Sequence, residues 1–272
     1  MGNETTDKFR QLEFAPVFAQ VKKLQTDRRY RDGKGLFFAE GIRNFVEAVD
    51  HKFPIETIIY SEKLLISPIA RKFVRQLKRE GVPFARASPE EFRAISKTER
   101  ASGIAAIFRQ NVQSLKQIKS DNFCWIALSS IRSNGNLGTL MRTSAATGAD
   151  GFILLGDEID IFDPNVVRPT MGAIFKQKIV RTNLTEFQNW IKSNKFQIIG
   201  ASPKGSNRYD QIPYSSPTIL MLGNERSGLS AKEESLCTEL VRIPMVPGMD
   251  SLNVSVAGSL LLYEVFRSTQ RN

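Results

Sequence analysis

Histidine and cysteine are scarce in this sequence, which holds one His and two Cys among 272 residues. With His51 as the single imidazole, a zinc site or a histidine-based catalytic triad is nearly excluded, and any chemistry must proceed without the usual proton shuttle. Cys124 lies in an apolar stretch and Cys237 in a predicted helix, without metal-ligand spacing between them. We therefore expect reduced, buried thiols, no bound metal and a reducing cytoplasm.

Long hydrophobic runs are also missing. No apolar stretch approaches the roughly 18 residues that a membrane span needs, and the first residues show neither the basic nor the apolar region of a signal peptide. These features predict a cytoplasmic protein with no membrane partner. Acidic residues are outnumbered, so that the net charge is +10, and about two-thirds of this surplus lies in the first 110 residues. Such a balance favours nucleic acid as a partner, whereas a generally basic surface is the alternative.

The first part of the chain alternates short apolar strands with amphipathic helices, which predicts a small α/β domain. The expected strands span 36–39, 55–60, 82–85 and 103–108, and the expected helices 17–24, 42–49, 69–79 and 89–95. Before the first strand, basic residues with an interleaved Tyr30 occupy residues 25–34. They suit phosphate contacts and a stacked base, or equally a solvated helix end. The basic residues within 69–79 are expected mainly to form a solvated face of the helix, and contact with RNA is the lesser alternative.

A polar stretch at residues 110–121 predicts a linker between a domain of residues 1–109 and a second of residues 122–272. The second region repeats the alternation, so the predicted fold class is α/β throughout. Its expected strands span 123–129, 151–155, 178–180, 196–200, 218–223 and 240–243. Its expected helices span 137–147, 165–175, 184–193, 230–237 and 252–269.

Glycine-bearing turns follow three strands of the second region, and ligands bind at the carboxyl ends of strands in open α/β sheets. In the first turn Asn136 is a candidate helix cap, and Arg142 lies about a turn and a half further on, which alone is a common pattern. The second turn places Glu225 directly after a buried strand that ends at Gly223. A carboxylate there is either functional or part of an ordinary surface turn. Ser230 is the expected cap of the next helix.

The third turn joins the strand ending at Ile243 to the last helix through two prolines and a glycine. Asp250, Ser251 and Asn253 cluster where this helix is expected to begin, either as helix caps or as ligands. The backbone groups between strand and helix belong to no regular element, so we expect this turn to form the floor of a pocket.

Together these segments resemble the three motifs of the SpoU (TrmH-type) RNA ribose methyltransferases, in order and in spacing. The segments are Asn136-Leu137-Gly138 with Arg142, Gly223-Asn224-Glu225-Arg226-Ser227-Gly228, and Ile243-Pro244-Met245 through Ser251-Leu252-Asn253-Val254-Ser255-Val256-Ala257. Residues 166–175 are similar to the family's stretch between the first two motifs. The basic lead and Phe38-Ala39-Glu40-Gly41 resemble the L30e-like RNA-binding extension of longer members.

The resemblance implies a SPOUT domain with a deep trefoil knot at the C-terminal end and S-adenosyl-L-methionine bound in that knot. It also implies a homodimer in which Arg142 of one subunit faces the cofactor of the other. Gly223, Ile243 and Leu252 would contact the cofactor. The reacting end would hold the remaining candidates, which are Asn136, Arg142, Glu225, Ser251 and Asn253. The implied reaction is methylation of a ribose 2′-OH in structured RNA, with 23S-type rRNA as the expected substrate.

Two alternatives share this resemblance. One is a tRNA ribose methyltransferase, against which the N-terminal extension argues by association. The other is a non-catalytic RNA-binding or ribosome-assembly protein of the same fold, which would be expected to have lost Arg142, Glu225 or Asn253. A nicotinamide-dependent dehydrogenase is poorly supported, because no glycine triplet with a downstream acid follows the first strand. One departure from the family pattern is Asn134, where members usually have Pro, and we expect the approach to Asn136 to be looser as a result.

Overall fold

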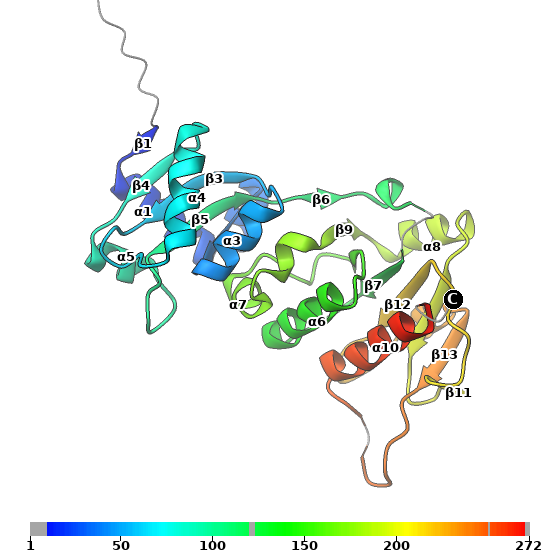
Figure 1. Cartoon of the computed structure of the whole chain (residues 1–272). Helices are drawn as coiled ribbons and strands as arrows, with labels where there is room; N and C mark the ends of the chain where they lie inside the picture. Colours follow the sequence, from blue (N-terminus) through cyan, green and yellow to red (C-terminus); the bar gives the residue numbers. More distant parts are fainter. Residues whose placement is uncertain (1–9, 120–122, 250, 270–272) are drawn as a thin grey trace, which may run out of the picture. The chain divides into compact units, whose positions relative to one another are not determined.

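The computed structural model describes residues 10–119, 123–249 and 251–269. The chain divides into two compact units. The first comprises residues up to Gln110 together with residues 162–176, and the second comprises residues 111–161 and 177–272. Figure 1 colours both units along the sequence. Asp250, one of the expected helix caps, lies outside the described residues, as do residues 120 and 121 of the expected linker.

The first unit is built on a mixed sheet with strand order β1-β4-β3-β5-β2. Strand β5 is antiparallel to β2 and β3, whereas β3, β4 and β1 are parallel. The strands are β1 (Gln11–Leu12), β2 (Leu36–Glu40), β3 (Ile55–Tyr60), β4 (Phe84–Arg86) and β5 (Ile104–Arg109). The helices are α1 (Phe14–Thr26), α2 (Arg28–Lys34), α3 (Ile42–Asp50), α4 (Pro68–Arg79) and α5 (Pro89–Ile95). The predicted α/β class is confirmed, and β3 and α5 have the expected bounds.

Local capping explains where α4 and α5 begin. The Ser67 side chain accepts the Ala70 N–H at the start of α4, and Pro68 occupies the first turn, where its missing N–H costs nothing. Helix α5 starts with a reciprocal capping box between Ser88 and Glu91. The apolar face of α4 is buried while its basic residues face outward, which is the amphipathic pattern of a helix lying on a sheet.

Residues 28–34 form helix α2, which the sequence analysis did not predict. Asp27 caps it by accepting the Tyr30 N–H at 3.1 Å. Arg31 is 2 % exposed, and its guanidinium donates to the Leu24 carbonyl at 2.6 Å and lies 3.5 Å from the Asp163 carboxylate. This cation is therefore committed to the interior of the first unit, and neither expected alternative, a phosphate contact or a solvated helix end, holds for Arg31.

Residues 162–176 pack within the first unit rather than forming the single helix expected at residues 165–175. They form α7 (Pro164–Val167) and two 3-10 turns, η2 (Arg168–Thr170) and η3 (Ala173–Lys176). The helix is interrupted because Pro169 has no N–H to donate, and because Met171 and Gly172 adopt φ of 52° and 91°. Phe162 and Phe175 pack against Phe37 and Phe108, with ring centroids 4.9 Å and 4.8 Å apart. The burial of these rings holds the segment on the first unit.

The second unit is built on a sheet of order β11-β13-β10-β12-β7-β8-β9-β6, in which every neighbouring pair of strands is parallel. The strands are β6 (Val112–Gln113), β7 (Cys124–Leu128), β8 (Gly151–Leu155), β9 (Lys178–Thr182), β10 (Gln197–Ala201), β11 (Asn207–Arg208), β12 (Thr218–Leu222) and β13 (Glu239–Arg242). The helices are η1 (Leu115–Gln117), α6 (Asn134–Ala146), α8 (Leu184–Lys192), α9 (Ala231–Glu234) and α10 (Val254–Thr269).

Helices cover both faces of the central strands, which explains their continuous apolar sequences. On one face, Trp125, Ile153 and Ile219 pack with Phe187 of α8. On the other, α6 and α10 lie side by side (Figure 1). Gly258 of α10 permits this contact, because a Cβ there would stand 2.7 Å from side-chain atoms of Leu140 and Leu222.

Several predicted bounds in the second unit were wrong. The expected helix at residues 230–237 is only the short α9, because the chain must turn before β13 begins at Glu239. Ser230 does cap it, as predicted, through a capping box with Glu233. The polar stretch expected to be a linker contains η1 and the strand β6, whose Val112 pairs with Ile179 in this sheet.

Candidate functional site

The order of strands reverses in the middle of the second sheet, next to β7. From β7 the chain builds outward through β8 and β9, and it then returns to the other side of β7 to form β10 and β12. At such a switch point the turns after neighbouring strands diverge and leave a crevice at the carboxyl edge, where ligands bind. Here the turns after β7 and β12 carry the first two predicted motifs.

Glu225 joins these two turns. Its carboxylate accepts the backbone N–H of Arg132 at 3.1 and 3.2 Å and that of Ser133 at 3.2 Å. It also accepts from Asn136 Nδ2 at 3.4 Å. Ser133, rather than Asn136, caps α6, and α6 begins earlier than the expected Leu137 because the Ser133 side chain accepts the Asn136 N–H. A carboxylate thus lies beside the N-terminal end of α6, where the helix dipole favours negative charge.

The third motif joins the same network through Asn253. Its Nδ2 donates to Asn136 Oδ1 at 2.8 Å, and its Oδ1 accepts the Ser255 N–H at 2.8 Å. Asn253 therefore caps α10, which begins at Val254 instead of the expected Leu252. Three predicted site residues that are far apart in the chain, Glu225, Asn136 and Asn253, form one continuous chain of hydrogen bonds.

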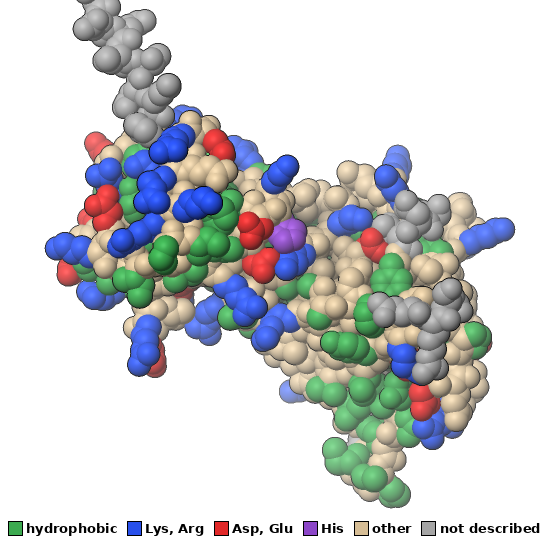
Figure 2. All heavy atoms as spheres, viewed as in Figure 1, with side chains coloured by type: hydrophobic (Ala, Val, Ile, Leu, Met, Phe, Trp, Pro, Cys, Tyr) green, Lys and Arg blue, Asp and Glu red, His purple; other side chains and the backbone are tan. Residues whose placement is uncertain are grey.

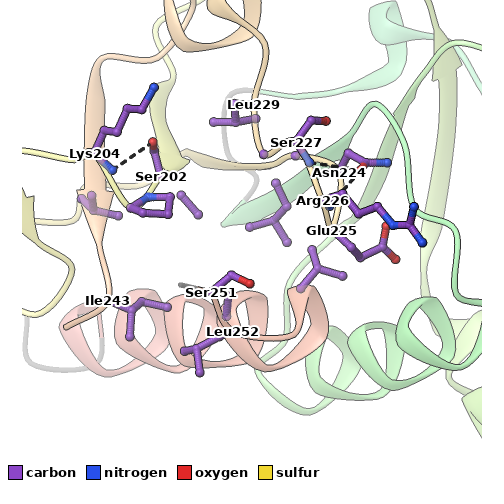
Figure 3. A pocket seen from close by; sticks show the side chains of 18 of the residues that line it. Ser202, Lys204, Asn224, Glu225, Arg226, Ser227, Leu229, Ile243, Ser251 and Leu252 are labelled. Carbon is purple, nitrogen blue, oxygen red and sulfur yellow. Dashed lines mark hydrogen bonds between the residues drawn. The ribbon is translucent and has the colours of Figure 1, made fainter. Parts of the chain in front are cut away.

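A cavity of about 350 Å³ lies beside this network. It is lined by the turns after β10, β12 and β13, together with the first turns of α10 (Figure 3). Ile243, Ser251 and Leu252 of the third turn contribute to its wall, as expected of a pocket floor, and Gly223 and Glu225 of the second turn line it as well. Leu229, Val241 and Val254 add buried apolar surface. The cavity thus combines an apolar lining with a polar rim, the usual character of a small-molecule site.

The turn after β12 depends on Gly223. A Cβ at this position would stand 2.2 Å from the backbone of Gly228, so only glycine allows the turn to close on itself. The closure is an isolated bridge in which Asn224 and Gly228 exchange backbone hydrogen bonds of 3.0 and 2.9 Å.

Three contributors were missed by the sequence analysis, namely Asn224, Ser202 and Lys204. Asn224 accepts the Arg226 N–H at 2.9 Å through its side chain and donates to Ser130 Oγ at 2.9 Å, so it holds the turn in shape and ties it to the turn after β7. An Asn that follows a strand and a glycine is a typical turn residue, so its role in shaping this turn could have been predicted from the sequence. Ser202 and Lys204, which follow β10, line the cavity (Figure 3). Because both residues directly follow a strand of the same sheet, the sequence could have identified them as candidates for the cavity wall.

Arg142 is placed differently from the other candidates. It lies on α6 with an exposed side chain, makes no hydrogen bond or ion pair with the described residues, and does not line the cavity. Within one chain, the structure brings Asn136, Glu225, Ser251 and Asn253 to one region but leaves Arg142 outside it.

The charge of Glu225 is set by its surroundings. Partial burial acts to raise its pKa, but the backbone N–H groups of the turn and the Asn136 amide outweigh it, so that the pKa of Glu225 lies below its ordinary value of 4.5. The carboxylate is therefore an anion at neutral pH and can only accept hydrogen bonds. By contrast, burial raises the pKa of Cys237 to about 12, which keeps this free thiol protonated.

No cluster of three His, Cys, Asp or Glu side chains suited to a metal ion occurs among the described residues. His51 ends α3 in the first unit, at the helix-end position that the sequence predicted. Within residues 10–119, 123–249 and 251–269, no helix is both long and apolar enough to cross a bilayer.

Comparisons with known proteins match both units. The profile of the SpoU rRNA Methylase family matches residues 124–263, and that of the MRM3-like substrate binding domain matches residues 17–106. The crystal structure of an AdoMet-bound rRNA methyltransferase from Sinorhizobium meliloti is 30% identical, with a TM-score of 0.85 over 95% of this chain and 98% of that one. Among curated proteins, the 23S rRNA (uridine(2479)-2′-O)-methyltransferase of Streptomyces viridochromogenes is 29% identical over 92% of this chain and 89% of its own length. The 23S rRNA (guanosine(2553)-2′-O)-methyltransferase RlmP of Bacillus subtilis is 26% identical over 90% and 93%.

Proposed function

Because this chain belongs to the SpoU rRNA methylase family, we propose that it transfers a methyl group from S-adenosyl-L-methionine to a ribose 2′-OH of 23S-type rRNA. The observation that carries this proposal is the hydrogen-bond chain from Glu225 through Asn136 to Asn253 at the rim of the cavity. The two curated relatives named above act on a uridine and a guanosine. Similarity to them therefore supports the ribose hydroxyl as the target and leaves the base open.

The cavity suits the proposed cofactor. Its volume of about 350 Å³ lies within the range of small-molecule sites, about 300–1,000 Å³. Gly223, Ile243 and Leu252 would hold the cofactor, whose apolar parts match the lining and whose polar ends match the rim. When bound, the cofactor supplies an activated methyl group, and the protein supplies alignment and electrostatics.

The polar residues would act chiefly by orientation. Glu225, as an anion, fixes the Asn136 amide by accepting from its Nδ2, and Asn253 fixes the Asn136 oxygen by donating to it. Both ends of the Asn136 amide are thus held before a substrate arrives, which is how a site reduces the entropic cost of alignment. Ser251, an exposed residue of the cavity wall, would be available to the substrate ribose.

Arg142 would stabilise the negative charge that develops on the ribose oxygen and hold the adjacent phosphate. A guanidinium has a pKa above about 12 and hardly loses its proton in proteins, so we assign it this electrostatic role rather than that of a general base, with the proton passing to water or a nearby acceptor. The assignment is tested in Arg142→Ala. A transfer rate that is restored by an added small-molecule base, in proportion to that base, would favour the general-base role instead.

The exposed position of Arg142 supports a homodimer in which it reaches the partner's cavity. Helix α10 carries a stripe of exposed apolar residues one turn apart, Val256, Leu260 and Tyr263, and hydrophobic side chains gather over this helix in Figure 2. An unpaired apolar stripe beside α6 is suited to pack against the same surface of a second copy.

Subunit mixing tests this arrangement. Arg142→Ala chains are mixed with chains whose cavity is blocked by Leu252→Glu, each inactive alone. If Arg142 acts across the interface, each heterodimer regains one complete site, which holds an intact cavity and an intact arginine. If Arg142 acts within its own subunit, the mixture stays inactive. Sedimentation measurements on each variant show whether dimers still form.

We further propose that the segment between β13 and α10 forms the trefoil knot of the SPOUT fold, with residues 1–109 as the RNA-binding domain and 122–272 as the methyltransferase domain. Residues 162–176 of the latter range belong to the first unit of the structure. The proposed knot is supported by the return of the segment between β13 and α10 to the cavity wall formed by the turn after β12. We place the protein in the cytoplasm, where rRNA is available to it. A crystal structure in which the segment passes outside the other turns would contradict the knot.

The function is tested in vitro and in cells. Purified protein should transfer labelled methyl from S-adenosylmethionine to unmodified 23S rRNA transcript and not to unmodified tRNA transcripts. A strain lacking the gene should lose one 2′-O-methyl mark in 23S rRNA. Transfer to tRNA alone would identify a tRNA enzyme. A melting temperature that S-adenosylmethionine does not raise, together with intact RNA binding, would indicate a non-catalytic protein.

A further inference from the structure

A second open groove lies in the first unit, at the carboxyl end of β3 beside α4. It has a volume of about 410 Å³, and its wall includes Tyr60, Leu65, Arg71, Val74, Arg75 and Lys78. Arg71, Arg75 and Lys78 follow one face of α4, because residues four and then three apart share a side of a helix. Lys and Arg side chains gather over α4 in Figure 2. We propose that this groove binds the phosphate backbone of the substrate RNA, an inference that rests on the proposed function.

The floor of the groove holds an unused hydrogen-bond donor. Tyr60 is 5 % exposed, and its hydroxyl oxygen accepts from Lys78 Nζ at 3.3 Å and from Arg86 Nε at 3.2 Å. Tyr60 and Arg86 end β3 and β4 directly opposite one another. Both lone pairs of the phenol oxygen are thus engaged by cations, which cannot accept a hydrogen bond in return. The described part of the chain offers no acceptor for the hydroxyl hydrogen, so it remains free for a ligand oxygen.

The cations around Tyr60 are held in place before a ligand arrives. The Lys78 ammonium lies 4.0 Å from the centroid of the Phe84 ring and 5.7 Å from that of Tyr60, and both aromatic faces attract it. Arg71 donates to the carbonyls of Leu65 at 2.5 Å and Glu62 at 3.2 Å, which fixes the loop that forms one wall. These contacts hold the side chains of the groove in fixed positions before a ligand binds.

Charge complementarity identifies the ligand as an anion. Arg75 is exposed and makes no hydrogen bond or ion pair with residues that the structure describes. One carboxylate, that of Glu62, also lines the groove; it lies 3.6 Å from Arg86, and both members of that pair are at least half exposed. A phosphate would receive the Tyr60 hydroxyl, the Lys78 ammonium and the Arg75 guanidinium together. Charge-assisted hydrogen bonds of this kind position an RNA backbone without reading its sequence.

The test compares two arginines of α4. Arg75 lines the groove, whereas Arg79 lies one turn later, is also exposed and does not line it. The affinity of the full chain for an unmodified 23S rRNA transcript is measured at several KCl concentrations. Arg75→Ala should weaken binding by about tenfold and make the salt dependence shallower by about 0.7–0.9 in the log–log slope. Arg79→Ala should change both quantities by less than half as much.

Tyr60→Phe separates the hydroxyl from charge. It retains the ring under Lys78 and removes no charge, so RNA affinity should fall by about threefold to tenfold with an unchanged salt slope. Melting temperatures show whether each variant is folded. Equal effects of Arg75→Ala and Arg79→Ala, or no effect of either, would overturn the proposal that the groove binds RNA. The basic residues would then form an unspecific surface or the binding site of a protein partner.

The two proposals fail in different ways. If Arg75→Ala binds RNA normally while wild-type protein methylates it, the proposal that the groove binds RNA is wrong and the proposed function stands. If wild-type protein transfers no methyl group to any RNA while Arg75→Ala still loses affinity, the function is wrong and the groove stands as an RNA site.

Discussion

The groove of the first unit and the cavity of the second differ in the kinds of contact that hold them in shape. Side chains of helix α4, the end of strand β3 and the loop between them form the groove, and most of its contacts involve cations. Turns from four strands form the cavity region, which is held by backbone geometry, two amides and one carboxylate. Contacts of the first kind depend on salt and each contributes part of an affinity. Contacts of the second kind fix positions, so a small displacement disturbs the whole site.

This difference predicts a separation of measurable effects. Changes in the groove should alter RNA affinity and its salt dependence while leaving cofactor affinity intact. Changes around the cavity should alter cofactor affinity or the rate of transfer while leaving the salt dependence intact. A single substitution that alters both cofactor affinity and the salt dependence of RNA binding would show that the two sites are not independent.

The largest effect is expected for Asn136→Ala. It removes the amide between Glu225 and Asn253, so the rate of methyl transfer at saturating substrates should fall by about 10²–10³ with little change in RNA affinity. Asn134→Ala is the matched control, because Asn134 is an exposed residue of the same helical turn. Single-turnover rates decide the outcome, and equal losses in both variants would show that the network carries no special role.

Next in size is Gly223→Ala. The added Cβ would stand 2.2 Å from the Gly228 backbone and force the turn to open, so S-adenosylmethionine affinity should fall by about 100-fold. Gly135→Ala serves as the control, since its Cβ would meet only Ser133 Oγ, at 3.8 Å. Isothermal titration calorimetry measures both. Normal cofactor affinity in Gly223→Ala would mean that the cofactor binds elsewhere.

A smaller effect is expected on assembly. Leu260→Asp places a charge in the apolar stripe of α10 and should weaken the proposed dimer by about tenfold or more. Ile66→Asp, at a position 77 % exposed in the first unit, should not change it. Sedimentation equilibrium distinguishes the two results. A dimer that tolerates Leu260→Asp would place the interface on another surface.

The smallest effect concerns pH. Because the folded-state pKa of Glu225 is below its ordinary value of 4.5, its contribution to stability is complete above that value and is lost as pH falls through the lower folded-state pKa. Urea unfolding of wild type and Glu225→Gln, compared between neutral pH and about pH 4 and below, should show the two proteins converging in stability as pH falls. A constant difference would indicate that the carboxylate is not specially stabilised.

Sequence reasoning was accurate where the determining contacts are local. Strand β3 and helix α5 have their expected bounds, and Ser230 caps α9 as predicted, because alternation, proline and capping residues act within a few positions. It failed for Arg31, whose partners Leu24 and Asp163 include one far along the chain. It also failed for residues 165–175, where one helix was expected and the aromatic rings of Phe162 and Phe175 instead pack on the first unit.

The amino-acid sequence alone determined the α/β class and the three turns that carry candidate residues, since strands, glycines and caps leave short-range patterns. Which of these turns meet depends on the tertiary fold. The reversal of strand order beside β7 brings Glu225 to Asn136, and the pairing of β3 with β4 brings Arg86 to Tyr60. Strand order depends on packing between distant segments, and no local periodicity encodes it.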